Sequence, residues 1–302
     1  MEPTGKYPLI KPLQFDPKVE TRAQKDYSRG IHPADQNQAT RNPFAKASPV
    51  SAPPERELQL KASTWVKSGI LRGLRRYGWE IKRYSLNEEA RLVQFLKLNK
   101  IETVLDVGAN SGQFGTLLRQ AGYTGQIISF EPQSAAHALL TRRAAMDPNW
   151  KVAPRAAVGS RAGEAEINIS ANSVSSSLLD IETKHVESAP SSAYVGKEKV
   201  PVIALDQEAL IPKAGRLFLK VDTQGFERPV LEGSNTLLKR VSGVLLETSL
   251  AGLYKGQADV IELLQIMAAH GFSLWNITPG FEDRKTGQLL QADLVFHKDT
   301  AA

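Results

Sequence analysis

A glycine-containing loop directly after an apolar run is the part of this sequence best suited to binding a ligand. The segment ETVLDVGANSGQFG spans residues 102–115, and its apolar half predicts a buried strand with Asp106 near the carboxyl end. Gly108 allows a tight turn after the strand, and Gly112 lets the backbone approach a ligand closely. Asn110 stands where glycine is common, and asparagine tolerates a left-handed backbone. The helix expected next would direct its N-terminal amides toward the crevice where α/β folds bind ligands.

A second acidic residue, Glu131, closes the next apolar run in the segment IISFEP. It follows the glycine loop at about the 20-residue separation at which a carboxylate reaches ribose hydroxyls in α/β folds. The glycine spacing departs from the G-x-G-x-x-G fingerprint of a pyrophosphate site, and the nucleoside-triphosphate loop ending in G-K-S/T is absent from the sequence. The sequence therefore predicts an adenosine-type ligand and disfavours a dinucleotide or a triphosphate.

Alternating apolar runs and helical patterns predict the sheet that must position these residues. Strands are predicted in ETVLDV, GQIISF, LFLKVD, GVLLET, FSLWNI and ADLVFH, and helices in SGQFGTLLRQAG, SAAHALLTRRAA, RPVLEGSNTLLKR and QADVIELLQIMAAHG. This alternation is typical of an α/β fold, and it predicts a domain at residues 101–302 with a mostly parallel Rossmann-like sheet and helices on both faces. Residues 160–205 form an insertion between the third and fourth core strands, where EAEINIS and KVPVIAL predict two extra strands around a serine-rich loop.

The first third of the chain has a different composition. Residues 1–54 hold nine of the 17 prolines and lack apolar periodicity, which predicts a disordered extension. Residues 55–100 are predicted to be a basic helical segment, with an amphipathic helix at 63–84 and a second helix at 87–99. The first 100 residues carry 19 Lys and Arg against 10 Asp and Glu. Such a flank could make weak contact with an anionic surface, or it could be only a solvated extension.

Composition excludes several other classes of protein. The chain has no cysteine, which excludes disulfides and thiolate metal sites, and its five histidines are dispersed, so we expect no essential metal. No apolar stretch approaches the roughly 18–20 residues that span a bilayer, and the N-terminus lacks the apolar core of a secretory signal. We therefore expect a cytoplasmic protein, whose oligomeric state the sequence does not indicate.

Four stretches of the sequence occur together in a recognisable combination. They are VLDVGANSG at 104–112, FEP at 130–132, SVSSSLL at 173–179 and LKVDTQGFERPVLEG at 219–233, and the later LLETS and QADLVF are in the same style. The combination resembles the FkbM family of class I S-adenosylmethionine-dependent methyltransferases, over roughly residues 65–298. The resemblance implies a Rossmann-like methyltransferase fold with S-adenosylmethionine as the cofactor.

The resemblance also implies roles for the candidate cofactor-binding residues. The first-strand carboxylate and the glycine loop would hold the methionine part of the cofactor, and these residues are Asp106, Gly108, Ala109, Asn110 and Gly112. Glu131, which Pro132 follows, would bind the ribose diol. Residues around the third strand, from Ala156 to Val158 with Ala157 between them, would border the adenine.

Asp222 would end the fourth strand near the sulfonium and the acceptor, although it could instead only cap the helix that follows. Methyl transfer from a sulfonium is an in-line displacement, and a hydroxyl acceptor would still benefit from a base. Asp222 is the first candidate for this base, and Glu247 is the second. Glu247 could equally be a hydrogen-bonded structural carboxylate. The serine loop could place Ser175, Ser176 and Ser177 against the substrate, or it could be a flexible linker.

The leading interpretation is O-methylation of a hydroxyl on a small molecule or a glycan. Ribose methylation of nucleic acid is the less favoured alternative, encouraged by the basic first third. The DTQG segment lacks the Pro-Pro-aromatic element typical of amino-group methylases. A catalytically silent nucleoside-binding module and a nicotinamide-dependent oxidoreductase are the remaining alternatives.

Overall fold

The computed structural model describes residues 88–298, so the predictions of a disordered extension at 1–54 and an amphipathic helix at 63–84 lie outside the described residues. The helices are α2 (Glu88–Leu98), α3 (Gln113–Gln120), α4 (Ser134–Ala144), α5 (Thr183–Ser188), α6 (Glu227–Glu232) and α7 (Val260–Ala269). The strands are β1 (Thr103–Val107), β2 (Gln126–Phe130), β3 (Trp150–Val152), β4 (Ala157–Val158), β5 (Gly163–Ser170), β6 (Tyr194–Ile203), β7 (Leu217–Val221), β8 (Val241–Ser249), β9 (Ser273–Pro279) and β10 (Gln291–His297). Short 3₁₀ turns are η2 (Pro190–Ser192), η3 (Leu205–Gln207) and η4 (Leu237–Lys239).

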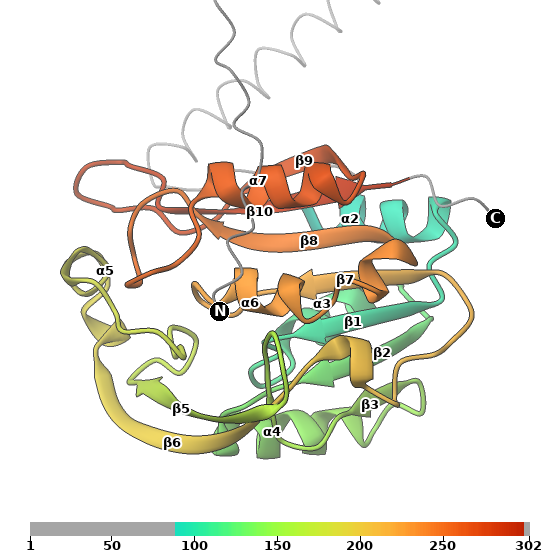
Figure 1. Ribbon diagram of the computed structural model, residues 1–302, viewed down its shortest axis with the longest axis horizontal. Coiled ribbons are helices and arrows are strands. Elements are labelled where there is room, and N and C mark those ends of the chain that lie inside the picture. The colour runs from blue at the N-terminus through green and yellow to red at the C-terminus, as the bar shows by residue number, and fades with distance from the viewer. Residues whose placement is uncertain (1–87, 299–302) are drawn as a thin grey trace, which may run out of the picture. The chain divides into compact units, whose positions relative to one another are not determined.

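Seven of these strands form one sheet in the order β3-β2-β1-β7-β8-β10-β9. Neighbouring strands from β3 to β8 pair in parallel, whereas β10 is antiparallel to both β8 and β9. Figure 1 shows these strands stacked from β3 at the bottom to β9 at the top. The order confirms the mostly parallel Rossmann-like sheet. The strand order reverses direction between β1 and β7. α/β folds bind ligands at the carboxyl ends of the strands at such a topological switch point.

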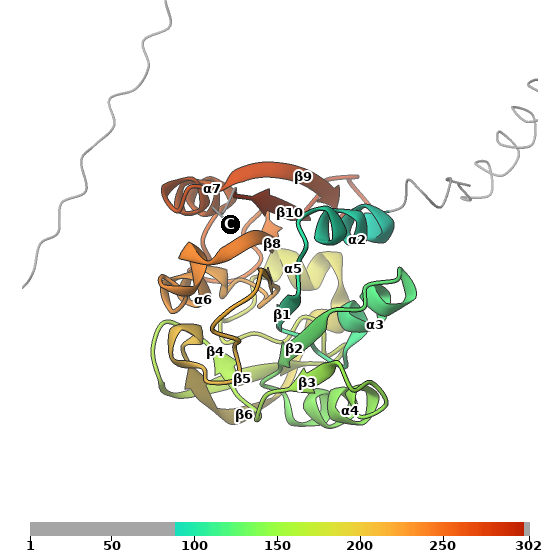
Figure 2. The ribbon, with the colours of Figure 1, turned by 90° about the vertical axis from the view of Figure 1, so that its right-hand side faces the viewer.

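Helices cover both faces of the sheet, because successive strand residues point to opposite faces. Figure 2 shows α6 and α7 on one face and α2, α3 and α4 on the other. On β7, Leu217, Leu219 and Val221 belong to the core that includes α6 and α7, whereas Phe218 belongs to the core that includes α2, α3 and α4. Lys220 lies two residues after Phe218 on the same strand, so its buried side chain points to the same face, the one covered by α2, α3 and α4.

The insertion forms a small sheet of its own in the order β4-β6-β5. Its long strands β5 and β6 are the two extra strands predicted between residues 160 and 205. The third strand of the large sheet is β3, whereas we expected that strand around Ala156 to Val158; Ala157 and Val158 instead pair with β6. The reason is Pro154, which follows the last β2 hydrogen bond, from the amide of Ala153 to the carbonyl of Ser129 (2.9 Å). Proline has no amide hydrogen to continue the ladder.

The prediction of a single helix at residues 228–240 was also wrong, because the chain forms α6 and then the separate turn η4. The break falls at Gly233, where a Cβ would overlap the carbonyl oxygen of Gly159. The chain therefore turns at the one residue type that permits this contact. Asp206 stabilises the second turn, since its carboxylate accepts hydrogen bonds from the amides of Thr236 (2.9 Å) and Leu237 (2.8 Å).

We expect Gly108→Ala to lower the free energy of unfolding by at least about 3 kcal/mol. Gly108 has a φ of +75°, and a Cβ there would overlap the backbone carbonyl oxygen of Asp222. Denaturant unfolding measures the change. Gly163→Ala is the matched control, since a Cβ at Gly163 meets nothing within 4 Å, and we expect a change within about 0.5 kcal/mol. Equal stability of the two variants would contradict the packing of the β1 loop against β7.

Candidate active site

A cavity of about 370 Å³ lies at the carboxyl ends of β1, β2, β7 and β8. The strand ends contribute Gly108, Glu131, Asp222 and Glu247, while the insertion contributes residues such as Ile167. This volume falls in the usual range of small-molecule sites, about 300–1,000 Å³. The cavity thus collects, in one space, carboxylates that are far apart in the sequence.

A row of polar side chains crosses the sheet beneath this cavity. Asp106 on β1 is directly opposite Ser129 on β2 and Lys220 on β7. The Ser129 hydroxyl donates to Oδ2 of Asp106 (3.1 Å) and accepts from Nε1 of Trp150 (3.0 Å). All four side chains are buried, so the sheet carries a hydrogen-bonded polar row through an otherwise apolar core.

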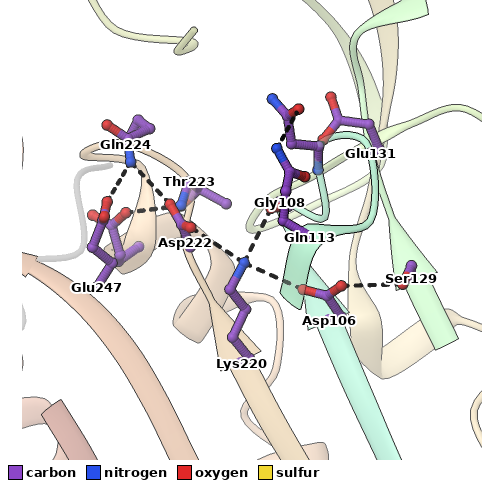
Figure 3. Close-up of polar contacts among 12 residues, drawn as sticks. Asp106, Gly108, Gln113, Ser129, Glu131, Lys220, Asp222, Thr223, Gln224 and Glu247 are labelled. Atoms are coloured by element: carbon purple, nitrogen blue, oxygen red, sulfur yellow. Dashed lines mark hydrogen bonds and ion pairs between the residues drawn. The ribbon is translucent and has the colours of Figure 1, made fainter. Parts of the chain in front are cut away.

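Lys220 connects this row to Asp222, which lines the cavity, and Figure 3 shows the contacts of its ammonium. Its ammonium lies 3.2 Å from Oδ1 of Asp106 and 3.2 Å from Oδ2 of Asp222, and it donates to the carbonyl oxygen of Gly108 (3.1 Å). Burial alone would lower the pKa of Lys220, but the two carboxylates outweigh it and raise the pKa above the usual range. Lys220 therefore remains charged and holds the ends of β1 and β7 together.

The loop after β1 takes backbone conformations that its sequence permits. Gly108 and Gly112 have φ values of +75° and +88°, and Asn110 has a φ of +47°. The Asn110 side chain accepts a hydrogen bond from the amide of Ser111 (2.7 Å), which stabilises the left-handed residue locally. A Cβ at Gly112 would lie 3.0 Å from Leu140, so this glycine also serves the packing below α3.

Glu131 is held rigidly on the cavity wall. Its two carboxylate oxygens accept hydrogen bonds from the backbone amides of Asn110 (2.7 Å) and Gln133 (2.8 Å). Burial outweighs these hydrogen bonds and raises the pKa of Glu131 to about 7. A fixed carboxylate facing a cavity is suited to accept hydrogen bonds from a pair of ligand hydroxyls.

The structure separates the predicted cofactor residues into two groups. Those that line the cavity are Gly108, Ala109, Asn110, Glu131, Pro132, Ala157 and Asp222. Asp106 is fully buried, and neither it nor Gly112 is among the lining residues. Lys220 lines the cavity and pairs with Asp106 (3.2 Å), so the Asp106 carboxylate is connected to the cavity through that ammonium. A direct contact of Asp106 with the cofactor stays a prediction.

Three carboxylates gather at the opposite end of the cavity from Glu131. Glu247 and Asp293 are cross-strand neighbours on β8 and β10, and Asp222 also lines this end. Burial first, and then the charge of Asp222, raise the pKa of Glu247 well above its usual range. The same two causes raise the pKa of Asp293 to about 6. These carboxyls therefore keep their protons at a pH where exposed carboxyls have lost them.

Gln224 joins two of these carboxylates. Its Nε2 donates to Oδ1 of Asp222 (2.9 Å) and to Oε2 of Glu247, as drawn in Figure 3. The Tyr254 hydroxyl donates to Oε1 of Gln224 (2.7 Å), which fixes which way the amide points. Gln224 has a φ of +54°, and a Cβ at the following Gly225 would lie 2.9 Å from Tyr254. The left-handed turn thus directs the amide to both carboxylates.

The serine loop is ordered by its own hydroxyls. The Ser176 hydroxyl donates to Oε1 of Gln133 (3.1 Å), and the Ser177 hydroxyl donates to the carbonyl oxygen of Gln224 (2.7 Å). Ser176 and Ser177 line the cavity, whereas Ser175 does not. Their contact with a substrate stays a prediction, since in this structure these hydroxyls hold the insertion over the strand ends.

Sequence reasoning missed three residues of this site, namely Lys220, Gln224 and Asp293. Lys220 was visible as the one charged residue in the apolar run LFLKV, and a lysine is almost never buried unless it is paired. Gln224 and Asp293 gave no comparable signal, because their roles depend on the β7 turn and on the pairing of β8 with β10.

Comparison with known proteins gives a family for this fold and site. The sequence model of a protein family, the methyltransferase FkbM domain, matches residues 106–274. The chain therefore belongs to the FkbM family of S-adenosylmethionine-dependent methyltransferases. A search of the curated proteins finds no match to this sequence.

Solved structures that match this chain include three methyltransferases. The magnesium protoporphyrin IX methyltransferase of Synechocystis PCC 6803, with bound SAM, has a TM-score of 0.38 and 11% identity over 70% of this chain and 78% of that chain. The precorrin-6y C5,15-methyltransferase of Geobacter metallireducens GS-15 has a TM-score of 0.38 and 11% identity over 72% of this chain and 92% of that one. A putative S-adenosylmethionine-dependent methyltransferase of Listeria monocytogenes has a TM-score of 0.40 and 9% identity over 70% and 98%.

Within residues 88–298, no three side chains of His, Asp or Glu are arranged to hold a metal ion. The expectation of no essential metal stays a prediction, which activity in EDTA would test. Of the helices in the described part of the chain, none is long and apolar enough to cross a membrane. The cytoplasmic location expected from the sequence likewise stays a prediction.

We expect Lys220→Met to lower the free energy of unfolding by about 3–5 kcal/mol, because it leaves the buried Asp106 carboxylate without its cation. Adding Asp106→Asn should recover part of this loss. Lys197→Met is the control, since Lys197 pairs with Glu166 at the surface (2.9 Å) and should cost less than about 1 kcal/mol. Similar losses in the two lysine variants would mean that the Lys220 pair is not buried as described.

If the ribose hydroxyls bind the Glu131 carboxylate as predicted, the affinity for S-adenosylhomocysteine should fall about tenfold between pH 8 and pH 6, because the pKa of Glu131 is raised to about 7. Calorimetric titration across this pH range measures the change. Glu131→Gln should bind more weakly at pH 8 and show little pH dependence. A wild-type affinity that does not change with pH would contradict the assignment.

Proposed function

We propose that this chain transfers a methyl group from S-adenosylmethionine to a hydroxyl oxygen of a small molecule or a glycan. The observation that carries the proposal is a single cavity bounded by Glu131 at one end and by Asp222 and Glu247 at the other. Bound S-adenosylmethionine supplies an activated methyl group on its sulfonium. The protein's own residues then have to orient the acceptor and accept its proton.

The residues on the cavity wall fit the parts of the cofactor. Glu131 offers a fixed acceptor to the ribose hydroxyls. Ala157 and Val158 are buried and apolar, which suits the adenine ring. The turn from Gly108 to Asn110, beside the Lys220 ammonium, suits the methionine part with its carboxylate.

Glu247 is the better candidate for the base, which reverses the order expected from the sequence. Asp222 has one oxygen paired with Lys220 (3.2 Å) and the other bonded to Gln224 (2.9 Å). Both amide hydrogen bonds to Glu247, from Gln224 and from Gln291, reach the same oxygen, Oε2. The other oxygen of Glu247, Oε1, can then accept a hydrogen bond from the acceptor hydroxyl or share a proton with Asp222. Because burial raises its pKa, Glu247 is a stronger base than an exposed carboxylate once it is ionised.

The charge of the cavity does not support nucleic acid as the acceptor. Among residues 88–298, its lining holds the carboxylates of Glu131, Asp222, Glu247 and Asp293 and one ammonium, that of Lys220, which is already paired. Nucleic-acid binding depends on cations that neutralise phosphates. A steep salt dependence of RNA or DNA binding to the full chain would reopen that alternative.

We expect methyl transfer to become faster as the pH rises, because Glu247 must lose its proton before it can accept one. Glu247→Gln should lower kcat by about 10²–10⁴-fold and leave S-adenosylhomocysteine binding unchanged. Asp293→Asn should shift the rising limb of the pH profile to lower pH, since it removes a like charge that raises the pKa of Glu247. Wild-type turnover in Glu247→Gln would remove Glu247 as the base.

The direct test of the proposed function is methyl transfer from tritium-labelled S-adenosylmethionine to a panel of hydroxylated small molecules and glycans. At about 100 times its dissociation constant, S-adenosylhomocysteine should stabilise the chain by about 2.7 kcal/mol in thermal unfolding, whereas NAD should not. Label found on an acceptor oxygen supports the proposal. Stabilisation without transfer to any acceptor would favour a silent nucleoside-binding module instead.

A further inference from the structure

A second, smaller cavity adjoins the first. It has a volume of about 140 Å³ and lies between the helices α2 and α3 and the strands β9 and β10. We call it the side groove. It shares the side chains of Phe114, Leu117, Leu245 and Asp293 with the larger cavity. An acceptor whose hydroxyl reaches Glu247 can therefore extend past Asp293 into the side groove.

Much of the side groove has apolar walls, which include an aromatic side chain. Leu92 from α2 and Val295 from β10 are buried on its walls, and Trp275 on β9 is 46% exposed there. The centroid of the Trp275 ring lies 4.8 Å from that of Phe95, and the two rings pack in a tilted arrangement. Such walls suit an apolar frame, such as a ring or a short hydrocarbon chain.

Every charged residue that the structure places on the side groove is acidic. Glu88 and Glu89 lie in the first turn of α2, and Asp293 lies on β10. The helix dipole explains carboxylates at the start of α2, but it does not explain Asp293. Asp293 is the cross-strand neighbour of Glu247 and lies where the side groove meets the larger cavity. A cation bound beside Asp293 would stabilise the ionised form of its carboxyl.

We propose that the side groove binds a protonated amine attached to an apolar frame, so that the acceptor is a hydroxylated amine. The inference rests on the proposed function, because it assigns the far part of the same acceptor. Glu88, Glu89 and Asp293 attract the ammonium, and the exposed face of Trp275 adds a cation–π contact. Anionic acceptors are disfavoured by the same charges.

Three probes with the same hydroxylated ring test the charge preference. Tyramine is positively charged, N-acetyltyramine is neutral and 4-hydroxyphenylacetate is negatively charged. Each is titrated into the full chain saturated with S-adenosylhomocysteine. We expect tyramine to bind about tenfold more tightly than N-acetyltyramine, and 4-hydroxyphenylacetate to bind most weakly.

Paired variants test the location. Glu88→Gln with Glu89→Gln should reduce the preference for tyramine to about threefold or less. Glu164→Gln with Glu187→Gln makes the same change in net charge at two exposed residues that line neither cavity, and it should leave the preference intact. Equal binding of tyramine and N-acetyltyramine, or a preference that both pairs of substitutions leave unchanged, would overturn the proposal.

Failure of all three probes to bind would also overturn the proposal. That result is expected if residues before Glu88, or a second copy of the chain, occupy the side groove. The S-adenosylhomocysteine affinity of each variant is measured alongside. If the wild-type chain does not bind S-adenosylhomocysteine, the proposed function fails; if it binds but shows no charge preference, only the side-groove assignment fails.

Discussion

A single buried ammonium is the constraint on which the rest of the site depends. Lys220 is almost fully enclosed, yet it is bonded to Asp106, to Asp222 and to the carbonyl oxygen of Gly108. A buried charge is tolerated only when its partners satisfy it, and here those partners lie on β1, in the loop after β1 and at the end of β7. The parallel pairing of β1 with β7 and the turn at Gly108 are therefore coupled to the electrostatics of the cavity.

The Lys220 ammonium also divides the cavity into two environments. Toward β2, Glu131 is fixed by backbone amides and faces apolar residues of the insertion. Toward β8, burial first and then the charge of Asp222 raise the pKa values of Glu247 and Asp293. One end thus suits a neutral diol beside an apolar ring, and the other suits proton transfer. That division fits the proposed methyl transfer from a nucleoside cofactor to a hydroxyl acceptor.

Most of the fold could be predicted from the sequence, because strand and helix periods are local signals. The glycine loop and the strand-end residues Glu131, Asp222 and Glu247 follow from the same pattern, since parallel strands place their carboxyl ends at one edge. The β3 register and the break at Gly233 could not be predicted, because they depend on Pro154 ending a ladder and on contact with Gly159. The facing pair of Glu247 and Asp293 depends on an antiparallel register that no local pattern specifies.

The most direct test of this account is a crystal structure of the chain with S-adenosylhomocysteine. We expect the ribose hydroxyls to bond to the Glu131 carboxylate and the adenine to lie against Ala157 and Val158. The sulfur should face the end of the cavity formed by Asp222 and Glu247. A nucleoside bound outside this cavity, or one whose ribose does not contact Glu131, would contradict it.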